Sequence, residues 1–272
     1  MCLFVCLAAV VIDKTSTGGS NVRGVTSVDD ELFVLLQRDV DQVAVFCFSD
    51  YKLLRPLSVP GLKPCERNDI TSCVRHKCLY MSDYNNTCIH RYDLRSSAVI
   101  KWRVPGSPRG LSVTPSCNLL VTCREPSKLV ELSADSGQCV REITLQSDIV
   151  RPCHSVQQTN GQYVVCHGFW DEDLHRVCLV GDDGKVTRSY GGQLGFDVGE
   201  LNWASHLAVD KDSQCIFVAD HSNNRVVLLS PTLECVCYIT EKLSSPHRLY
   251  LDQATRRLFV GQGNGDVVVI QL

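Results

Sequence analysis

The stretch that decides the fold is Ser205-His-Leu-Ala-Val-Asp210, followed by Cys215-Ile-Phe-Val-Ala-Asp220 and His221-Ser-Asn-Asn-Arg-Val-Val-Leu-Leu229. Short runs of apolar and β-branched residues bounded by turn residues indicate three consecutive strands. The same order recurs near the end of the chain, from Pro246 to Ile270. A unit that repeats within one sequence identifies a repeat architecture before any residue chemistry is considered.

The unit occurs six times. Its equivalent apolar or small positions follow one another at intervals of 41 to 52 residues and are Val25, Ile70, Leu111, Ser155, Leu207 and Leu249. Four short strands in each interval, with no sustained helical period, predict an all-β fold, a six-bladed β-propeller of four-stranded antiparallel blades. We expect one domain over 1–272, with blades at about 22–58, 68–104, 107–145, 151–191, 203–240 and 246–272.

The last blade has only three strands of its own, and an incomplete sheet would expose an apolar edge. Residues 3–12 are mostly apolar and precede the first strand of blade 1, just as the fourth strand of every other blade precedes the first strand of the next. We therefore expect residues 3–12 to close the ring as the outermost strand of the last blade. The alternative is a signal sequence over 1–12, although the segment lacks a basic start. In that case the protein would be extracellular.

Composition limits the function classes. Apolar residues make up 44% of the chain and charged residues 21%, and the net charge is -3, which is not the footprint of a nucleic-acid-binding protein as a whole. No stretch is long enough for a transmembrane helix. The 16 cysteines include no Cys-x-x-Cys pair, and most of them stand in apolar runs, as buried free thiols do. Free thiols predict a reducing, cytoplasmic location.

Phe217-Val-Ala-Asp220 and the following His221-Ser-Asn-Asn-Arg-Val226 carry a family resemblance. They resemble NHL repeats, and the whole chain is similar to the NHL domain of TRIM-NHL proteins. Repeats 1 and 4 depart from the pattern at 37–41 and 168–173. The resemblance implies a six-bladed propeller that selects the target of a ubiquitin ligase. It implies no ligase activity, because the RING, B-box and coiled-coil segments are not in this sequence. The chain is then either a stand-alone propeller or the C-terminal piece of a longer protein, and its start in a closing strand favours the second.

The strand starts of a propeller gather at one mouth of its central channel, and basic residues occupy several of them. A ring of guanidinium and imidazole groups there would recognise carboxylate or phosphate. The candidate binding residues are Arg23, Arg109, Arg151, His154, His206, His247 and Arg248, with Trp170 as a loop contact. We expect the Asx residues that follow Asp83 and Asp220 to form turns, and Arg225 to pair with an acid.

Nucleophile elbows, phosphate-binding glycine loops and zinc-protease motifs are missing from the sequence. We therefore expect a non-catalytic module that binds a protein partner through its loops and channel mouth, without a metal or cofactor, a membrane or a small-molecule substrate. Two alternatives stay open. One is a metal-dependent propeller lyase or lactonase using His154, His206 and His247. The other is RNA binding through the arginine-lined face.

Overall fold

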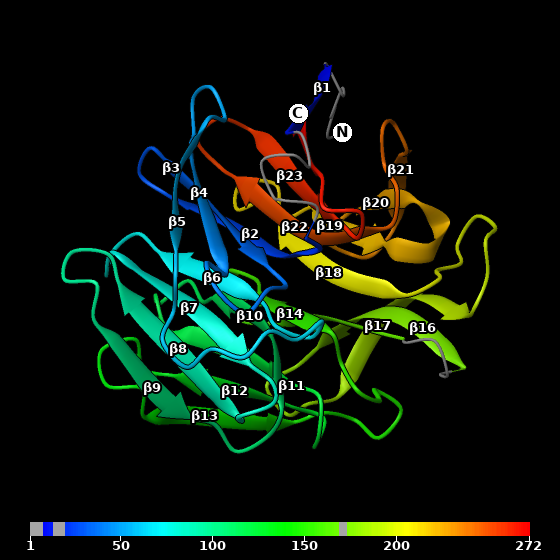
Figure 1. The fold of residues 1–272 in the computed structure, drawn as a ribbon. Helices are drawn as coiled ribbons and strands as arrows, with labels where there is room; N and C mark the ends of the chain where they lie inside the picture. Colours follow the sequence, from blue (N-terminus) through cyan, green and yellow to red (C-terminus); the bar gives the residue numbers. More distant parts are fainter. Residues whose placement is uncertain (1–7, 13–19, 169–172) are drawn as a thin grey trace.

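Consecutive strands pair into six separate four-stranded antiparallel sheets arranged as the blades of a propeller (Figure 1). The computed structural model describes residues 8–12, 20–168 and 173–272. Blade 1 comprises β2 (Val22–Val28), β3 (Glu31–Leu36), β4 (Val43–Cys47) and β5 (Leu53–Leu57). Blade 2 comprises β6 (Ile70–Cys73), β7 (Cys78–Asp83), β8 (Cys88–Asp93) and β9 (Val99–Arg103). Blade 3 comprises β10 (Pro108–Val113), β11 (Leu119–Cys123), β12 (Lys128–Leu132) and β13 (Cys139–Thr144).

The last three blades complete the ring. Blade 4 comprises β14 (His154–Gln157), β15 (Tyr163–His167), β16 (Leu174–Val180) and β17 (Val186–Gln193). Blade 5 comprises β18 (Ala204–Val209), β19 (Ile216–Asp220), β20 (Arg225–Leu229) and β21 (Cys235–Ile239). Blade 6 comprises β22 (Pro246–Asp252), β23 (Arg257–Gln262), β24 (Val267–Gln271) and β1 (Ala8–Ile12). A 3-10 turn, η1 (His221–Asn223), connects β19 to β20. The predicted all-β six-bladed fold is confirmed.

The ring closes where the sequence predicted. β1 pairs antiparallel with β24, from Ala8 opposite Gln271 to Ile12 opposite Val267. Figure 1 shows β1 beside the red C-terminal end of the chain. The closing strand is thus confirmed for residues 8–12, and residues 3–7 lie outside the described part of the chain.

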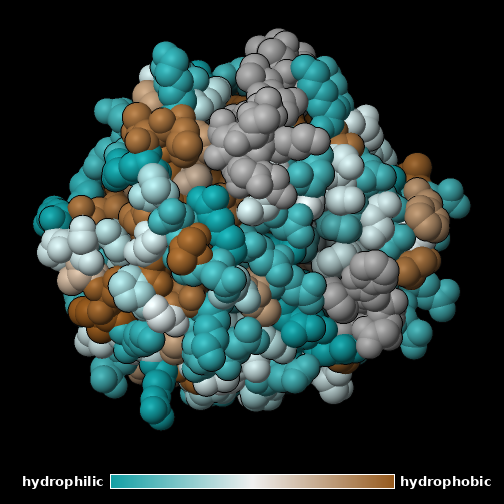
Figure 2. All heavy atoms as spheres, in the orientation of Figure 1, coloured by the Kyte–Doolittle hydropathy of each residue, from teal (hydrophilic) through white to brown (hydrophobic). Residues whose placement is uncertain are grey.

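The hydrophobic core is divided among the interfaces between blades. Six clusters of buried side chains each combine residues of two neighbouring blades, such as Leu79 and Met81 of blade 2 with Phe33 and Val45 of blade 1. The middle strands are therefore apolar on both faces. The outermost strands β5, β9, β13 and β21 are largely exposed. Several of their apolar side chains, such as Leu53, Ile100 and Val140, are exposed. Figure 2 shows separate hydrophobic patches among hydrophilic residues on one face of the molecule.

The innermost strands of the six blades, β2, β6, β10, β14, β18 and β22, contact one another around the central channel. All six begin at the same end of the channel because every blade repeats the same strand order. Among the described residues no helix is long and apolar enough to cross a membrane.

Candidate functional site

A recurrent β-bulge shapes the first mouth of the channel. The register between the first and second strands of a blade shifts next to Arg23, Arg109, Ser205 and His247. A bulge leaves one extra residue out of the ladder and re-aims its side chain. His247 is thus equivalent to Arg23 and Arg109, whereas His206 is equivalent to Arg248, which explains why the histidines do not align one to one in the sequence.

One layer of residues blocks the channel just inside this mouth. It takes one residue from each inner strand, or from the position immediately before it: Gly24, Asp69, Gly110, His154, His206 and Arg248. The two glycines leave the space that the four side chains fill. A Cβ on Gly110 would come within 2.7 Å of the His154 Cα, and one on Gly24 would contact Ile70. We call these six residues the plug layer.

Asp69 is the centre of the plug layer and is almost fully buried. Its Oδ2 accepts the Leu111 backbone N–H at 2.9 Å and the His206 Nε2–H at 3.3 Å. The Arg248 Nε lies 3.6 Å from Oδ1, and the His154 Nε2 lies 3.9 Å from Oδ2. Burial opposes ionisation of Asp69, but the His206, Arg248 and His154 side chains outweigh it and lower its pKa to about 2.

The two histidines of the plug layer stack with their ring centroids 3.6 Å apart. Burial lowers the pKa of His154 to about 3, with the neighbouring His206 as a further cause, and burial also lowers the pKa of His206. Both imidazoles are therefore neutral at pH 7. His154 hydrogen-bonds through Nε2 to the Leu111 carbonyl oxygen at 3.0 Å, and His206 accepts the Leu249 N–H at Nδ1.

These bonds argue against a metal ion bound to the Nε2 atoms of His154 and His206, whereas the His154 Nδ1 has no hydrogen-bond partner among the described residues. The ligand-type atoms of Asp69, His154 and His206 lie within 4.8 Å of one another. However, the Nε2 of His154 faces a carbonyl oxygen and must carry a proton, and the Nδ1 of His206 already accepts a backbone N–H. A metal on the Nε2 of His206 would therefore require an imidazolate. His247, the third histidine of the metal hypothesis, is not part of this group.

Arg248 of the plug layer and several further arginines lie close together at the mouth. The guanidinium of Arg248 donates to the carbonyl oxygens of Arg23, His247 and Asn68 at 2.8 to 3.0 Å. The Arg23 Nη1 lies 3.2 Å from the His247 Nε2. Arg109 is about 2% exposed, as is Arg248. This group of Arg23, Arg109 and Arg248, together with Arg124, Arg67 and Arg151 at its edge, is called the cationic mouth below.

The arginines of the cationic mouth repel one another. Burial lowers the pKa of Arg248 to about 10, and Arg109 and Arg23 lower it further against the opposing effect of Asp69. Burial also lowers the pKa of Arg23, with Glu66 acting in the opposite direction. The pKa of Arg124 falls because of burial and then because of Arg109, Arg151 and Arg67. A charge of opposite sign at this mouth would relieve that repulsion.

The structure thus brings Arg23, Arg109, His247 and Arg248 together at the first mouth, and it places His154 and His206 in the plug layer beside Arg248 and Asp69. Arg151 is half-buried at the edge, with its backbone N–H bonded to the Ser127 hydroxyl at 3.1 Å. Trp170 lies outside the described residues.

Sequence reasoning missed Asp69 and the Trp203–His221 pair, which borders His247 with ring centroids 5.4 to 5.5 Å away. Asp69 could have been found, because it precedes Ile70 as His206 precedes Leu207.

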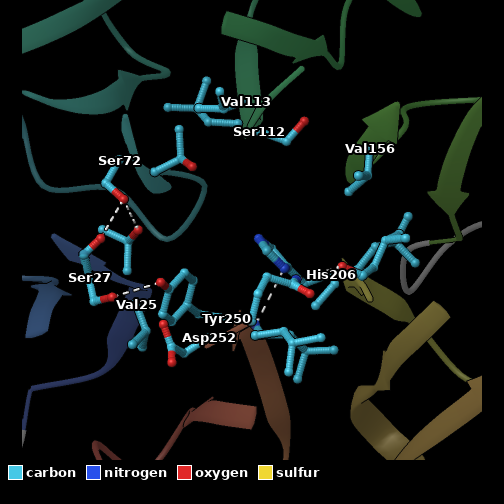
Figure 3. Close-up of a pocket in the computed structure, with 18 of the residues that line it drawn as sticks. Val25, Ser27, Ser72, Ser112, Val113, Val156, His206, Tyr250 and Asp252 are labelled. Atoms are coloured by element: carbon cyan, nitrogen blue, oxygen red, sulfur yellow. Dashed lines mark hydrogen bonds between the residues drawn. The ribbon is translucent and has the colours of Figure 1, made fainter. Parts of the chain in front are cut away.

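The other end of the channel is an open cavity of about 360 Å³ whose inner wall includes His154 and His206 (Figure 3). Hydroxyl groups line it and bond to one another and to the backbone: Ser27 to the Tyr250 hydroxyl at 2.7 Å, and Ser72 to the Ser27 carbonyl oxygen at 2.8 Å. Apolar residues such as Val113 and Val156 complete the lining. We call this end the hydroxyl cavity.

No family model matches the sequence, and no curated protein matches it. Solved structures do match the fold. Virginiamycin B lyase from Staphylococcus aureus is 10% identical with a TM-score of 0.66, over 97% of this chain and 99% of the lyase. A streptogramin B lyase, also 10% identical, matches with the same score over 93% and 94%. Kuenenia stuttgartiensis hydrazine synthase is 13% identical, with a TM-score of 0.66 over 93% and 96%.

These neighbours correct the expectation that the chain is not an enzyme. That expectation rested on missing catalytic motifs, yet lyases have this propeller fold at 10% identity to the chain. When two chains of the same fold are only 10% identical, the absence of known catalytic motifs from one of them gives no basis for excluding catalysis. The matches establish the propeller fold, and the NHL-type resemblance within it stays a prediction.

Proposed function

We propose that the chain is an NHL-type recognition module whose cationic mouth binds an acidic segment of a protein partner. The observation that carries the proposal is that Arg23, Arg109, Arg124 and Arg248 gather at one end of the channel, where burial and the neighbouring guanidinium groups lower the pKa of Arg23, Arg124 and Arg248. A carboxylate placed among them would form charge-assisted hydrogen bonds and remove the repulsion at the same time.

The burial of the mouth favours a protein over RNA. Arg109 and Arg248 are almost fully buried, so their charge acts on a group that enters the mouth. A nucleic-acid strand instead requires basic side chains spread along a groove that follows its backbone. The net charge of -3 also disfavours a polyanion on the rest of the surface. An aspartate, a glutamate or a chain-terminal carboxylate carries the single negative charge that such a compact group of arginines would bind.

Fluorescence polarisation with three labelled probes tests the proposal: a Glu-rich peptide, the same peptide with Gln in place of Glu, and oligouridine. We expect the Glu-rich peptide to bind most tightly and Arg23→Gln or Arg67→Gln to weaken it roughly tenfold, about the worth of one charge-assisted hydrogen bond. Arg95→Gln, an exposed arginine on the loop after β8, is the matched control. Equal binding of the Gln peptide, or tighter binding of oligouridine, would contradict the proposal.

A second candidate function is a lyase acting in the hydroxyl cavity. Two lyases are among the structural neighbours, and a catalytically inactive histidine-to-alanine variant of virginiamycin B lyase was solved with quinupristin at a TM-score of 0.63 to this chain. In this chain His154 and His206 border the cavity. Chromatography of quinupristin after incubation with the protein tests this candidate. Conversion that is lost in His206→Gln supports it, and unchanged quinupristin rejects this substrate.

A further inference from the structure

In two blades the second strand ends in an aspartate that lies opposite the first residue of the third strand. In blade 5 it is Asp220 opposite Arg225, an ion pair of 2.7 Å, and Asn223 donates its side-chain amide to the same carboxylate. In blade 2 the equivalent pair is Asp83 opposite Cys88. The carboxylate is therefore retained while its arginine partner is replaced by a thiol.

The rest of the turn in blade 2 still holds the carboxylate as in blade 5. Asn86 donates its backbone N–H to Asp83 Oδ1 at 3.1 Å and its side-chain amide to Oδ2 at 2.8 Å. The Lys63 backbone N–H lies 3.4 Å from Oδ2. Asp83 has no exposed surface. A buried, oriented carboxylate that has lost its arginine needs another source of positive charge.

A second replacement accompanies the first. Two residues after Cys88 stands His90, fully buried, where blade 5 has Val227 and blade 3 has Val130. The His90 Nε2 lies 3.1 Å from Asp83 Oδ2. The His90 Nδ1 is buried and has no hydrogen-bond partner among the described residues. The ring proton can therefore sit on Nδ1, which leaves the Nε2 lone pair, directed at Asp83, available to a metal ion.

We propose that Asp83, Cys88 and His90 form a zinc-type metal site within blade 2. Their ligand atoms all lie within 4.8 Å of one another. Carboxylate oxygen, imidazole nitrogen and thiolate sulfur are the donors that Zn²⁺ prefers, at roughly 2.0 to 2.3 Å. Two such ligands on a tetrahedral ion are about 3.3 Å apart, close to the separation between Asp83 and His90. The ion replaces the charge that Arg225 supplies in blade 5.

The site is independent of the function proposed above, because it lies at the blade 2 turn and none of its three residues belongs to the cationic mouth. The sequence gives no recognisable zinc motif, since the ligands follow the spacing Asp-x-x-x-x-Cys-x-His. Only the pairing of β7 with β8 places the carboxylate opposite the thiol. Metal binding requires the thiolate and so releases a proton from Cys88.

Cobalt substitution tests the site on the full chain. The protein is stripped with a chelator under reducing conditions and titrated with Co²⁺ alone. We expect one equivalent to produce a thiolate-to-cobalt absorption band in the near ultraviolet, and Zn²⁺ to displace it and raise the melting temperature. Cys88→Ser should abolish the band, and Cys235→Ser, at an exposed cysteine on β21, should retain it.

The double variant Cys88→Arg with His90→Val guards against a folding artefact. It restores the blade 5 arrangement, in which Arg225 pairs with Asp220 beside Val227, so it should fold without metal and bind no cobalt. A band that survives Cys88→Ser comes from other thiols and overturns the proposal. Absence of any band in the wild type, with no response of the melting temperature to Zn²⁺, also overturns it and leaves a His90–Asp83 ion pair only.

Discussion

The two ends of the central channel are built by the same six strands, yet their side chains differ in charge and in packing. At the cationic mouth, arginine side chains are buried and bonded largely to backbone carbonyl oxygens, and Arg23 also contacts the neighbouring His247. At the hydroxyl cavity, serine, threonine and tyrosine hydroxyls bond among themselves and leave about 360 Å³ open. Charged side chains therefore occupy one end of the channel, and neutral side chains line an open cavity at the other.

The difference shows what the plug layer does. Asp69 supplies a carboxylate at the depth where Arg248 is buried, and its Oδ2 also fixes His206, which faces the hydroxyl cavity. Without that carboxylate the buried guanidinium would lack its nearest anion. The plug layer therefore separates a site for anions from a site for neutral groups within one channel.

Acid should have the largest effect, through the buried histidines of the plug layer and of the adjoining mouth. Burial lowers the pKa of His154 to about 3 and of His221 to about 4, and it also lowers those of His206 and His247. The unfolded chain binds protons at these histidines below about pH 6.5, and the folded chain does not. Stability is thus complete above that pH and is lost on acidification, by roughly 2.7 kcal/mol per pH unit near pH 5 for His154 and His221 alone, with His206 and His247 acting in the same direction.

Urea unfolding followed by tryptophan fluorescence at pH 7.5, 6 and 5 measures this slope. His221→Gln, at the rim of the mouth, should reduce the slope by one proton. A free energy of unfolding that stays constant from pH 7 to 5 would show that these histidines are not buried as described.

Asp69→Asn should have the next largest effect. The substitution keeps the shape of the side chain and removes the charge that faces Arg248 and His206, which we expect to cost about 3 to 5 kcal/mol of unfolding free energy. Asp252→Asn is the control at the hydroxyl cavity, where the carboxylate is half-buried and accepts from Thr255. Similar losses in the two variants would remove the distinction between the two ends.

Gly110→Ala tests the space in the plug layer. The new Cβ would lie 2.6 Å from the Cys153 carbonyl oxygen and 2.7 Å from the His154 Cα, so the layer must expand at a cost of about 1 to 3 kcal/mol. Gly192→Ala in β17, where a Cβ meets nothing within 4 Å, is the matched control. Thermal melts of both variants give the comparison, and a Gly110→Ala protein as stable as the control would refute the tight layer.

The smallest effect is expected at the hydroxyl cavity. Ser112→Ala removes a hydroxyl that donates to the Ser155 carbonyl oxygen at 2.8 Å. The cavity offers room for water to replace that donor, so the loss should stay near the worth of one neutral hydrogen bond, about 0.5 to 1.5 kcal/mol. Denaturant titration resolves a change of this size. A loss of unfolding free energy as large as that of Asp69→Asn would mean that the hydroxyl cavity depends on this one hydroxyl as strongly as the plug layer depends on Asp69.

The sequence allowed the fold to be predicted because each blade repeats its own pattern of apolar strands and turns, and even the closing strand followed from counting strands in the last repeat. Most residues of the cationic mouth were predicted for the same reason. Asp69 was missed because it is the only acid at its repeat position, and its importance comes from contacts with His206 and Arg248, which are more than 130 residues away. The pairing of Asp83 with Cys88 likewise depends on strand register.

The register of β1 on β24 has a consequence for the order of folding. Ala8 and Gln271 are opposite each other although 263 residues separate them (271 − 8), whereas neighbouring blades bring together residues about 42 apart, such as Leu207 and Leu249. Closing the longer loop costs about 1.5 to 2 kcal/mol more in chain entropy. A nascent or refolding chain therefore gains its blade contacts first and its ring last, and until β1 docks, the β24 edge is the place where two unfinished molecules would exchange strands.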